Sequence, residues 1–150
     1  MMTIGTICNR EVITVQRDAT VLHAAMLMRQ YHVGDVVVIE TRNAQCVPIG
    51  IVTDRDVVIK LVATELDSAV ITVGDIMEPK LTIVKECSGV FEAIQAMTAK
   101  GVRRLPVVDD AGGLVGIITL DDLLLLLAKE FSTLTKLVTR EQKNEAIKRR

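Results

Sequence analysis

Apolar residues recur along the chain with two periods, and these predict helices and strands in a fixed order. Two segments repeat apolar residues at i, i+3, i+4 and i+7, the spacing of one buried helical face. They are Val21, Ala24, Ala25 and Met28, and then Val90, Ala93, Ile94 and Met97. Each is followed by two short β-branched runs between turn residues, which predict buried strands at 36–39, 49–52, 105–108 and 115–118. Further helices are predicted to begin at Thr53 and Thr119.

The two halves of this pattern are copies of one another. An offset of 69 positions aligns Gly5 with Gly74, Val15 with Val84, Val21 with Val90, Ala24 with Ala93, Met28 with Met97 and Val38 with Val107. Beyond the first strand of each predicted pair the offset drops to 66, aligning Gly50, Thr53 and Asp56 with Gly116, Thr119 and Asp122. Self-similarity at a fixed period indicates repeated structural units. The change of offset falls between two strands, where a hairpin loop tolerates a change of length.

We therefore predict an α+β fold with two tandem β-α-β-β-α repeats. The first repeat is expected at 1–66 and the second at 67–131, followed by a basic helical tail at 132–150. From the end of the second repeat into the tail, Phe131, Leu134, Leu137 and Val138 alternate with charged residues, which indicates an extended amphipathic helix. Residues 129–150 hold seven Lys or Arg against three Asp or Glu.

Composition narrows the possible partners. The 150 residues carry a net charge of −1 and only 2% aromatic residues, so nucleic-acid binding is not expected. The longest apolar run, from Leu123 to Ala128, is too short to cross a membrane. The three cysteines and two histidines are not spaced like zinc ligands, so we expect no metal site, cysteines packed as small core residues, and a cytoplasmic protein.

Each repeat ends its strand pair with the phrase Gly-x-x-Thr-x-x-Asp, at Thr53 and Asp56 and again at Thr119 and Asp122. On the residues alone, helix capping is the favoured interpretation, because Thr caps a helix and an acid stabilises its first turn. The same geometry can also serve a ligand. Free N–H groups at a helix start attract phosphate, and a carboxylate accepts hydrogen bonds from ribose hydroxyls.

The doubled phrase, the segment Val-Arg-Arg-Leu-Pro-Val-Val-Asp at 102–109 and the segment Val-Gly-Asp-Ile-Met at 73–77 together resemble CBS domains. The resemblance covers residues 4 to about 130. It implies a stand-alone CBS domain pair, or Bateman module, whose repeats pack about a pseudo-two-fold axis and leave two clefts. In this family the clefts bind AMP, ADP, ATP, S-adenosylmethionine or similar ligands.

The resemblance also implies roles for individual residues. Asp56 and Asp122 would hold the ribose, and Thr53 and Thr119 would approach the ribose or phosphate. Arg103 and Arg104 would meet phosphates or the base, and guanidinium groups suit phosphate because they bind it bidentately. Alternatively, the two arginines form a solvated pair ahead of a strand. Ser88, which opens a helix, is a lesser candidate.

The first repeat departs from this pattern. Gly34 and Asp35 stand where the second repeat has Arg103 and Arg104, and Ala19 stands where it has Ser88. Because a carboxylate at Asp35 would repel phosphate, we expect two clefts of unequal affinity. Asp122 is then expected to be the firmer ribose anchor, although Arg55 would restore some positive charge.

These features predict a regulatory, ligand-sensing protein rather than an enzyme, because no nucleophile and base pair can be assembled from the motifs. No cofactor is expected beyond the adenosyl ligand. The alternative is a structural or interaction module with vestigial clefts. CBS pairs commonly form homodimers through their helices, which would bury the Leu123 to Leu127 face, and an unidentified protein target is expected to read the ligand state.

Overall fold

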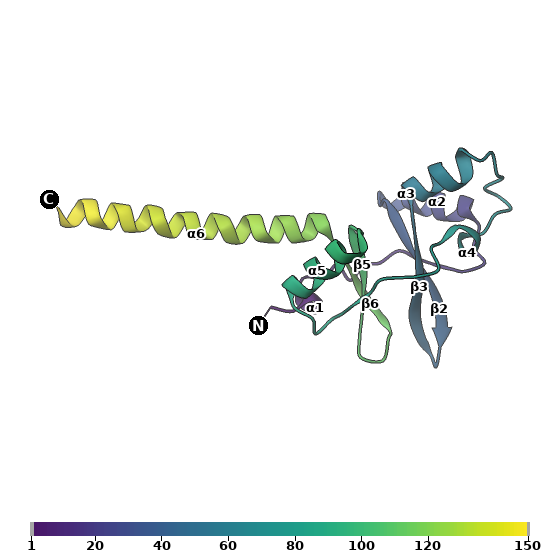
Figure 1. The fold of residues 1–150 in the computed structure, drawn as a ribbon, viewed down its shortest axis with the longest axis horizontal. Coiled ribbons are helices and arrows are strands. Elements are labelled where there is room, and N and C mark those ends of the chain that lie inside the picture. The colour runs from purple at the N-terminus through teal and green to yellow at the C-terminus, as the bar shows by residue number, and fades with distance from the viewer. Residues whose placement is uncertain (1, 150) are drawn as a thin grey trace. The chain divides into compact units, whose positions relative to one another are not determined.

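The protein's computed structural model describes residues 2–149 (Figure 1). The elements of the first repeat are α1 (Ile4–Ile7), β1 (Thr14–Gln16), α2 (Val21–Tyr31), β2 (Asp35–Arg42), β3 (Gln45–Thr53), α3 (Asp54–Val57) and the π-helical turn η1 (Val58–Val62). The second repeat contains α4 (Val73–Ile76), β4 (Val84–Lys85), α5 (Val90–Lys100), β5 (Arg104–Val108), β6 (Leu114–Thr119) and α6 (Leu120–Lys148). This order confirms the predicted α+β class with two tandem repeats.

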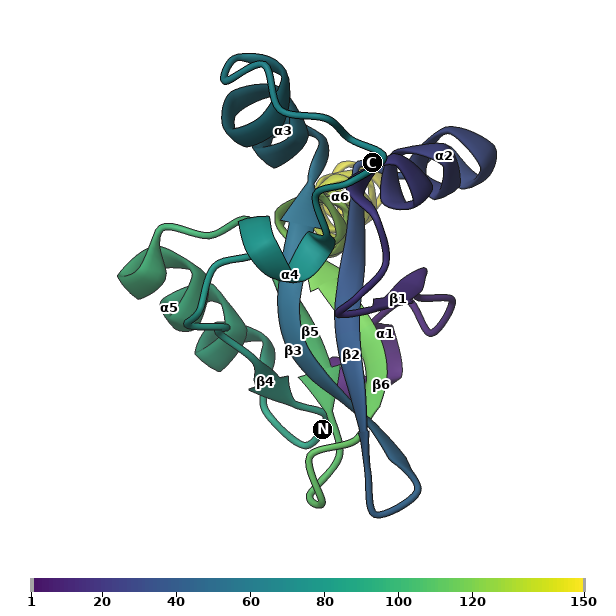
Figure 2. The ribbon, with the colours of Figure 1, turned by 90° about the vertical axis from the view of Figure 1, so that its right-hand side faces the viewer.

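Each repeat forms its own three-stranded sheet, in the orders β1-β2-β3 and β4-β5-β6. The first strand of each sheet runs parallel to the second, and β2 and β3 form an antiparallel hairpin that is visible in blue in Figure 2. The chain divides into two compact units, Met1–Ile118 and Thr119–Arg150. The first unit therefore holds nearly all of both sheets, and the second holds α6.

The two sheets meet through an apolar cluster inside the first unit. Val37 and Ile39 of β2 and Ile117 of β6 are buried together, with Ile51 of β3 packed against them. Ile51 and Ile117 occupy equivalent positions in the two repeats, so the contact joins the same face of each sheet. Burial of this face from water is the main force that holds the repeats together.

The repeats also exchange their first short helices. The Ile4 amide in α1 donates a hydrogen bond of 2.8 Å to the Ser88 carbonyl of the second repeat. The Val73 amide in α4 donates one of the same length to the Ala19 carbonyl of the first repeat. These are equivalent residues at an offset of 69, so each repeat completes the other.

The principal helices end at equivalent positions in the left-handed conformation. His32 follows α2 with φ of 53°, and Gly101 follows α5 with φ of 64°. Glycine adopts this conformation without a Cβ penalty, which explains its use at a helix end. The turn after α5 therefore directs the chain sharply into β5, with Arg103 just before the strand and Arg104 as its first residue.

The first hairpin is longer than predicted. The strands extend to Arg42 and from Gln45, so that only Asn43 and Ala44, with φ of 50° and 62°, form the loop. Two consecutive residues with positive φ are typical of the tight turn that matches strand twist. The extra residues of the first repeat are thus accommodated mainly by longer strands. The second hairpin has the loop 109–113 between shorter strands.

The last helices of the repeats differ most. After α3 the first repeat continues only through the turn η1, where the Thr64 hydroxyl donates to the Lys60 carbonyl at 2.8 Å. In contrast, α6 is one continuous helix of 29 residues, which confirms the predicted extended helix through the tail (Figure 1). None of the helices within residues 2–149 is long and apolar enough to span a membrane.

Candidate functional site

A cavity of about 330 Å³ opens between the two repeats within the first unit. Its walls are Ile51, Thr53, Asp54 and Arg55 from the first repeat and Gly101, Val102, Arg103 and Arg104 from the second. Pockets for small molecules typically enclose about 300–1,000 Å³. The cavity therefore brings together three of the predicted site residues, Thr53, Arg103 and Arg104, from opposite repeats.

A capping box holds the Thr53 side of the cavity. Thr53 Oγ1 accepts a hydrogen bond from the Asp56 amide at 3.1 Å, and Asp56 Oδ2 accepts one from the Thr53 amide at 2.9 Å. This is the capping interpretation favoured from the residues alone. Asp56 Oδ1 lies outside the capping box, 3.9 Å from Lys60 Nζ, and keeps capacity to accept a ligand hydroxyl.

The backbone at the start of α3 is already satisfied. The Asp54 amide donates to the Gly34 carbonyl at 2.9 Å, and the Arg55 amide donates to Asp54 Oδ1 at 2.8 Å. With Asp56 bonded to Thr53, the amides of all three residues have acceptors. The expectation that free N–H groups attract a phosphate is therefore wrong for this helix. Any attraction for an anion must come from the arginine side chains.

Arg104 is the more buried of the two adjacent arginines. Its side chain is 28% exposed, and its Nη1 lies 3.4 Å from Asp35 Oδ2. Within the described part of the chain, its Nε is buried and has no hydrogen-bond partner. Arg103 is exposed at the rim. The pair thus presents one exposed and one partly buried guanidinium to the cavity.

Asp35 lies beside Arg104 with its side chain 18% exposed. Burial has the largest effect on the Asp35 carboxyl and raises its pKa. The Arg104 guanidinium lowers this pKa, and the negative charge of Asp54 raises it. Together these effects leave the pKa of Asp35 above its ordinary value. A raised pKa means that the fold disfavours the ionised carboxylate despite its arginine neighbour. Holding the ionised carboxylate of Asp35 in this position therefore costs the folded protein free energy.

Thr119 and Asp122 lie in the second unit and form the equivalent capping box. Thr119 Oγ1 accepts from the Asp122 amide at 3.1 Å, and Asp122 Oδ2 accepts from the Thr119 amide at 3.0 Å. Ser88 precedes α5, and its backbone carbonyl accepts the Ile4 amide. The cavity of the first unit thus gathers Thr53 with the two arginines, and the other predicted residues belong to separate local structures.

Four cavity residues were not predicted as part of a site, namely the apolar Ile51 and Val102, and Asp54 and Gly101. Asp54 lies inside the Thr-x-x-Asp phrase, and Gly101 ends α5. Asp54 is an exposed acid on the first turn of α3. Because acids are common at this position for helix stability alone, the sequence pattern did not mark Asp54 as a ligand-site residue. Gly101 could have been recognised as a helix end with Val102 and the arginines directly after it.

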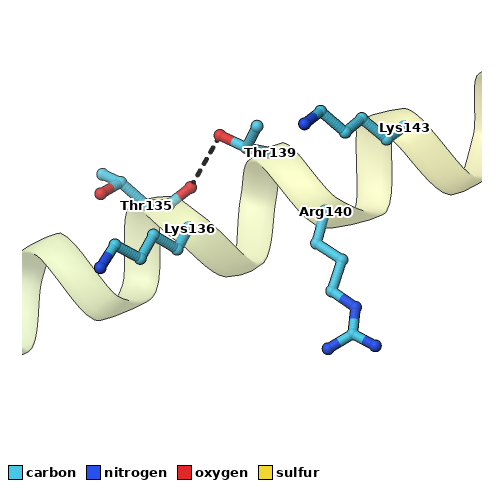
Figure 3. A pocket seen from close by; sticks show the side chains of 5 residues that line it. All are labelled: Thr135, Lys136, Thr139, Arg140 and Lys143. Carbon is cyan, nitrogen blue, oxygen red and sulfur yellow. Dashed lines mark hydrogen bonds between the residues drawn. The ribbon is translucent and has the colours of Figure 1, made fainter.

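A second hollow lies along α6 and has a different character. Its lining residues are Thr135, Lys136, Thr139, Arg140 and Lys143. Figure 3 shows Arg140 pointing away from Thr139 and Lys143, and Thr139 Oγ1 donates to the Thr135 carbonyl at 3.1 Å. Because one helix supplies every wall, this is a gap between exposed side chains. Among residues 2–149, no group of three or more His, Cys, Asp or Glu is arranged to hold a metal ion.

Comparisons with known proteins agree with this architecture. A family model described as CBS domain matches residues 4–63 and 73–129. An uncharacterized protein of Methanopyrus kandleri is 39% identical over 123 residues, which cover 82% of this chain and 61% of that protein. The chain spans 21% and 51% of the length of two further curated relatives.

Two solved structures share the fold. A putative signal-transduction protein with CBS domains from Burkholderia ambifaria is 30% identical with a TM-score of 0.74, covering 84% of this chain and 93% of that one. A CBS domain pair in complex with 5′-methylthioadenosine and S-adenosyl-L-methionine is 22% identical with a TM-score of 0.75, covering 87% and 98%. At this low identity the second structure bears on the fold alone.

Proposed function

Because this chain belongs to the CBS domain family and contains a pair of such domains, we propose that it is a regulatory module that binds an adenosyl ligand in the cavity between its repeats. One observation carries the proposal. Thr53 from the first repeat and Arg103 and Arg104 from the second line the same cavity of about 330 Å³. A polar hydroxyl and two guanidinium groups around an apolar wall suit a ligand with a sugar and a phosphate or carboxylate.

Each part of the cavity suits a part of such a ligand. The apolar side chains of Ile51 and Val102 offer a surface for a flat base. Asp56 does not line the cavity, but it is bonded to Thr53, which does, and its Oδ1 outside the capping box is proposed to accept a ribose hydroxyl. Arg103 lines the cavity and is exposed, so it is placed to meet a phosphate. The same fold accommodates 5′-methylthioadenosine and S-adenosyl-L-methionine in another protein. AMP, ADP, ATP and S-adenosylmethionine are therefore the ligands to test.

The protein is proposed to act without catalysis, since the cavity offers groups that hold hydroxyls and anions. Thr53 Oγ1 is held by its capping hydrogen bond, and within residues 2–149 no hydrogen bond joins it to Asp54, the neighbouring acid on the cavity wall, whose Oδ1 accepts from the Arg55 amide. Regulation would arise when the ligand bridges the two repeats, because the cavity walls come from both. A partner protein would read the resulting change in their packing.

Titration calorimetry with AMP, ATP and S-adenosylmethionine tests the proposal. The wild-type protein is expected to bind at least one of them, and Arg103→Ala is expected to weaken that binding. Arg42→Ala is a matched control, because Arg42 is an exposed arginine on β2 outside the cavity walls. Absence of binding to all three ligands would refute the adenosyl proposal.

The alternative function is an interaction module whose clefts bind no ligand. It is favoured by one observation, namely that Arg104 is already engaged by Asp35. Under this alternative the two charges serve only to join the repeats. The same titrations separate the two functions, because the interaction module predicts no heat with any adenosyl compound.

A homodimer is the second part of the proposal, and α6 supports it. Apolar residues follow each other along α6 at alternating spacings of four and three, at Leu120, Leu124, Leu127, Phe131, Leu134 and Val138. From Leu124 to Val138 their exposure runs from 42% to 69%. This spacing is the seam of a coiled coil, which only another helix with the same period covers efficiently. A second copy of α6 provides such a helix, and Glu141 ends the seam.

A further inference from the structure

Asp35 and Arg104 stand at the same position of the two repeats but carry opposite charges. At this position Arg104 already has a partner before any ligand arrives, because Asp35 Oδ2 lies 3.4 Å from its Nη1. An incoming phosphate must therefore share or displace Asp35. Asp35 consequently affects any contact between Arg104 and a ligand.

The guanidinium of Arg104 is only partly satisfied by Asp35. The ion pair is longer than the 2.7–2.9 Å or so of a strong charge-assisted hydrogen bond. Its Nε is buried and unpaired within the described residues. Arg104 lines the cavity, and a guanidinium has donors besides the one at Nη1 that faces Asp35. The ion pair leaves room for a ligand, but it places a negative charge next to that ligand.

The charges around the cavity are balanced rather than uniformly positive. Arg55, Arg103 and Arg104 line it, and Asp54 lines it as well. Asp35 is not a wall residue but contacts Arg104, and its side chain is only 18% exposed, so that water screens its field weakly. Each additional negative charge on a ligand is therefore attracted by the three arginines but repelled by Asp35 and Asp54.

We propose that Asp35 selects ligands of this cavity by charge, disfavouring a polyphosphate chain relative to a nucleoside or nucleoside monophosphate. The inference rests on the proposed adenosyl site and adds a determinant of specificity to it. Asp35 is distinguished from Asp54 because it contacts an arginine that reaches the cavity, whereas Asp54 is exposed to solvent at the rim.

The test compares adenosine, AMP and ATP binding in the wild type, Asp35→Asn and Asp35→Glu by titration calorimetry. Loss of the charge in Asp35→Asn is expected to strengthen ATP binding about tenfold and AMP binding less, with adenosine affinity unchanged within about twofold. Asp35→Glu keeps the charge and is expected to retain the wild-type preference. Asp110→Asn removes an acid whose side chain is 89% exposed and is the matched control.

Two results would overturn the inference: an equal change for all three ligands, which would indicate altered packing, or no change for any. Titration with inorganic tripolyphosphate separates this failure from failure of the proposed function. If no adenosyl compound binds but tripolyphosphate binds more tightly to Asp35→Asn than to the wild type, charge selection stands and the adenosyl proposal fails. If tripolyphosphate binding is also unchanged, both fail.

Discussion

Asp35 and Arg104 are equivalent residues of the two repeats, and they form an ion pair with each other, with 3.4 Å between Oδ2 and Nη1. A first repeat that kept arginine here would place two guanidinium groups side by side. The aspartate therefore replaces repulsion with attraction at the junction. This contact gives a structural reason why the first repeat has an aspartate where the second repeat has an arginine.

The first prediction concerns stability and pH at Asp35. Its pKa lies above the ordinary value of 3.8, so the folded protein binds the proton more tightly than the unfolded chain does. The free energy of unfolding must then fall as pH rises through the interval above 3.8. Asn at this position cannot ionise. Urea unfolding is thus expected to show Asp35→Asn gaining stability relative to the wild type between pH 3 and pH 7, and a constant difference would contradict this.

The second prediction concerns the glycines of the final strands. A Cβ at Gly116 would lie 2.6 Å from Cys8 Sγ and 2.9 Å from the Asn9 carbonyl oxygen, whereas one at Gly50 would meet the side chain of Met77. Backbone cannot move as readily as a flexible methionine. Gly116→Ala is expected to lower the free energy of unfolding by about 1–3 kcal/mol, and Gly50→Ala by less than about 1 kcal/mol.

Chemical denaturation measures both glycine variants against Gly89→Ala, where the nearest atom to an added Cβ lies 4.0 Å away. This control is expected to change stability by no more than about 0.5 kcal/mol. Equal losses at Gly50 and Gly116 would show that the close approach of the Asn9 backbone does not limit the packing.

The third prediction concerns Asp75, which closes the capping box of α4. Hydrogen bonds from the Thr72 backbone amide and from its side chain hold the pKa of Asp75 below 3.8. A depressed pKa stabilises the fold above the ordinary value, and this contribution is lost as pH falls through the folded value. Asp75→Asn is therefore expected to lose more stability relative to the wild type at pH 6 than at pH 2.5. Urea unfolding at the two pH values checks this, with Asp110→Asn as the exposed control.

The fourth prediction concerns the seam on α6. Leu134→Lys places a charge in the seam, and it is expected to convert a dimer into a monomer because a buried lysine disrupts coiled-coil packing. Thr133→Lys adds the same charge at an exposed neighbouring position outside the seam and should leave the dimer intact. Light scattering after size-exclusion chromatography gives the mass. A wild-type monomer, or identical behaviour of both variants, would refute the proposed dimer.

The repeat offset predicted the fold well because it reflects backbone geometry. The helix faces at Val21 and Val90, the strand pairs and the capping phrases at Thr53 and Thr119 are local patterns, and the structure confirms them. The length of the first hairpin was underestimated. Strand pairing extends wherever a partner strand is present, and this is not visible in the composition of the turn.

Long-range contacts were less predictable. Asp35 was correctly marked as unusual, but its pairing with Arg104 depends on how two sheets pack. Cys46 in β3 and Cys87 in the turn after β4 are exposed, so the expectation of core cysteines is wrong for both, because a single residue carries no periodic signal of its own. The occupied amides at the start of α3 could not be foreseen either, since their acceptors include the distant Gly34 carbonyl.

The central claim is that an adenosyl ligand occupies the cavity shared by the two repeats. The most direct measurement is a titration of the ¹⁵N-labelled protein with AMP, followed by amide chemical shifts. The account predicts that Thr53 and Arg103 respond together, at the same AMP concentrations, and that Lys143 on α6 does not. Shifts confined to one repeat, or no shift at millimolar AMP, would contradict it.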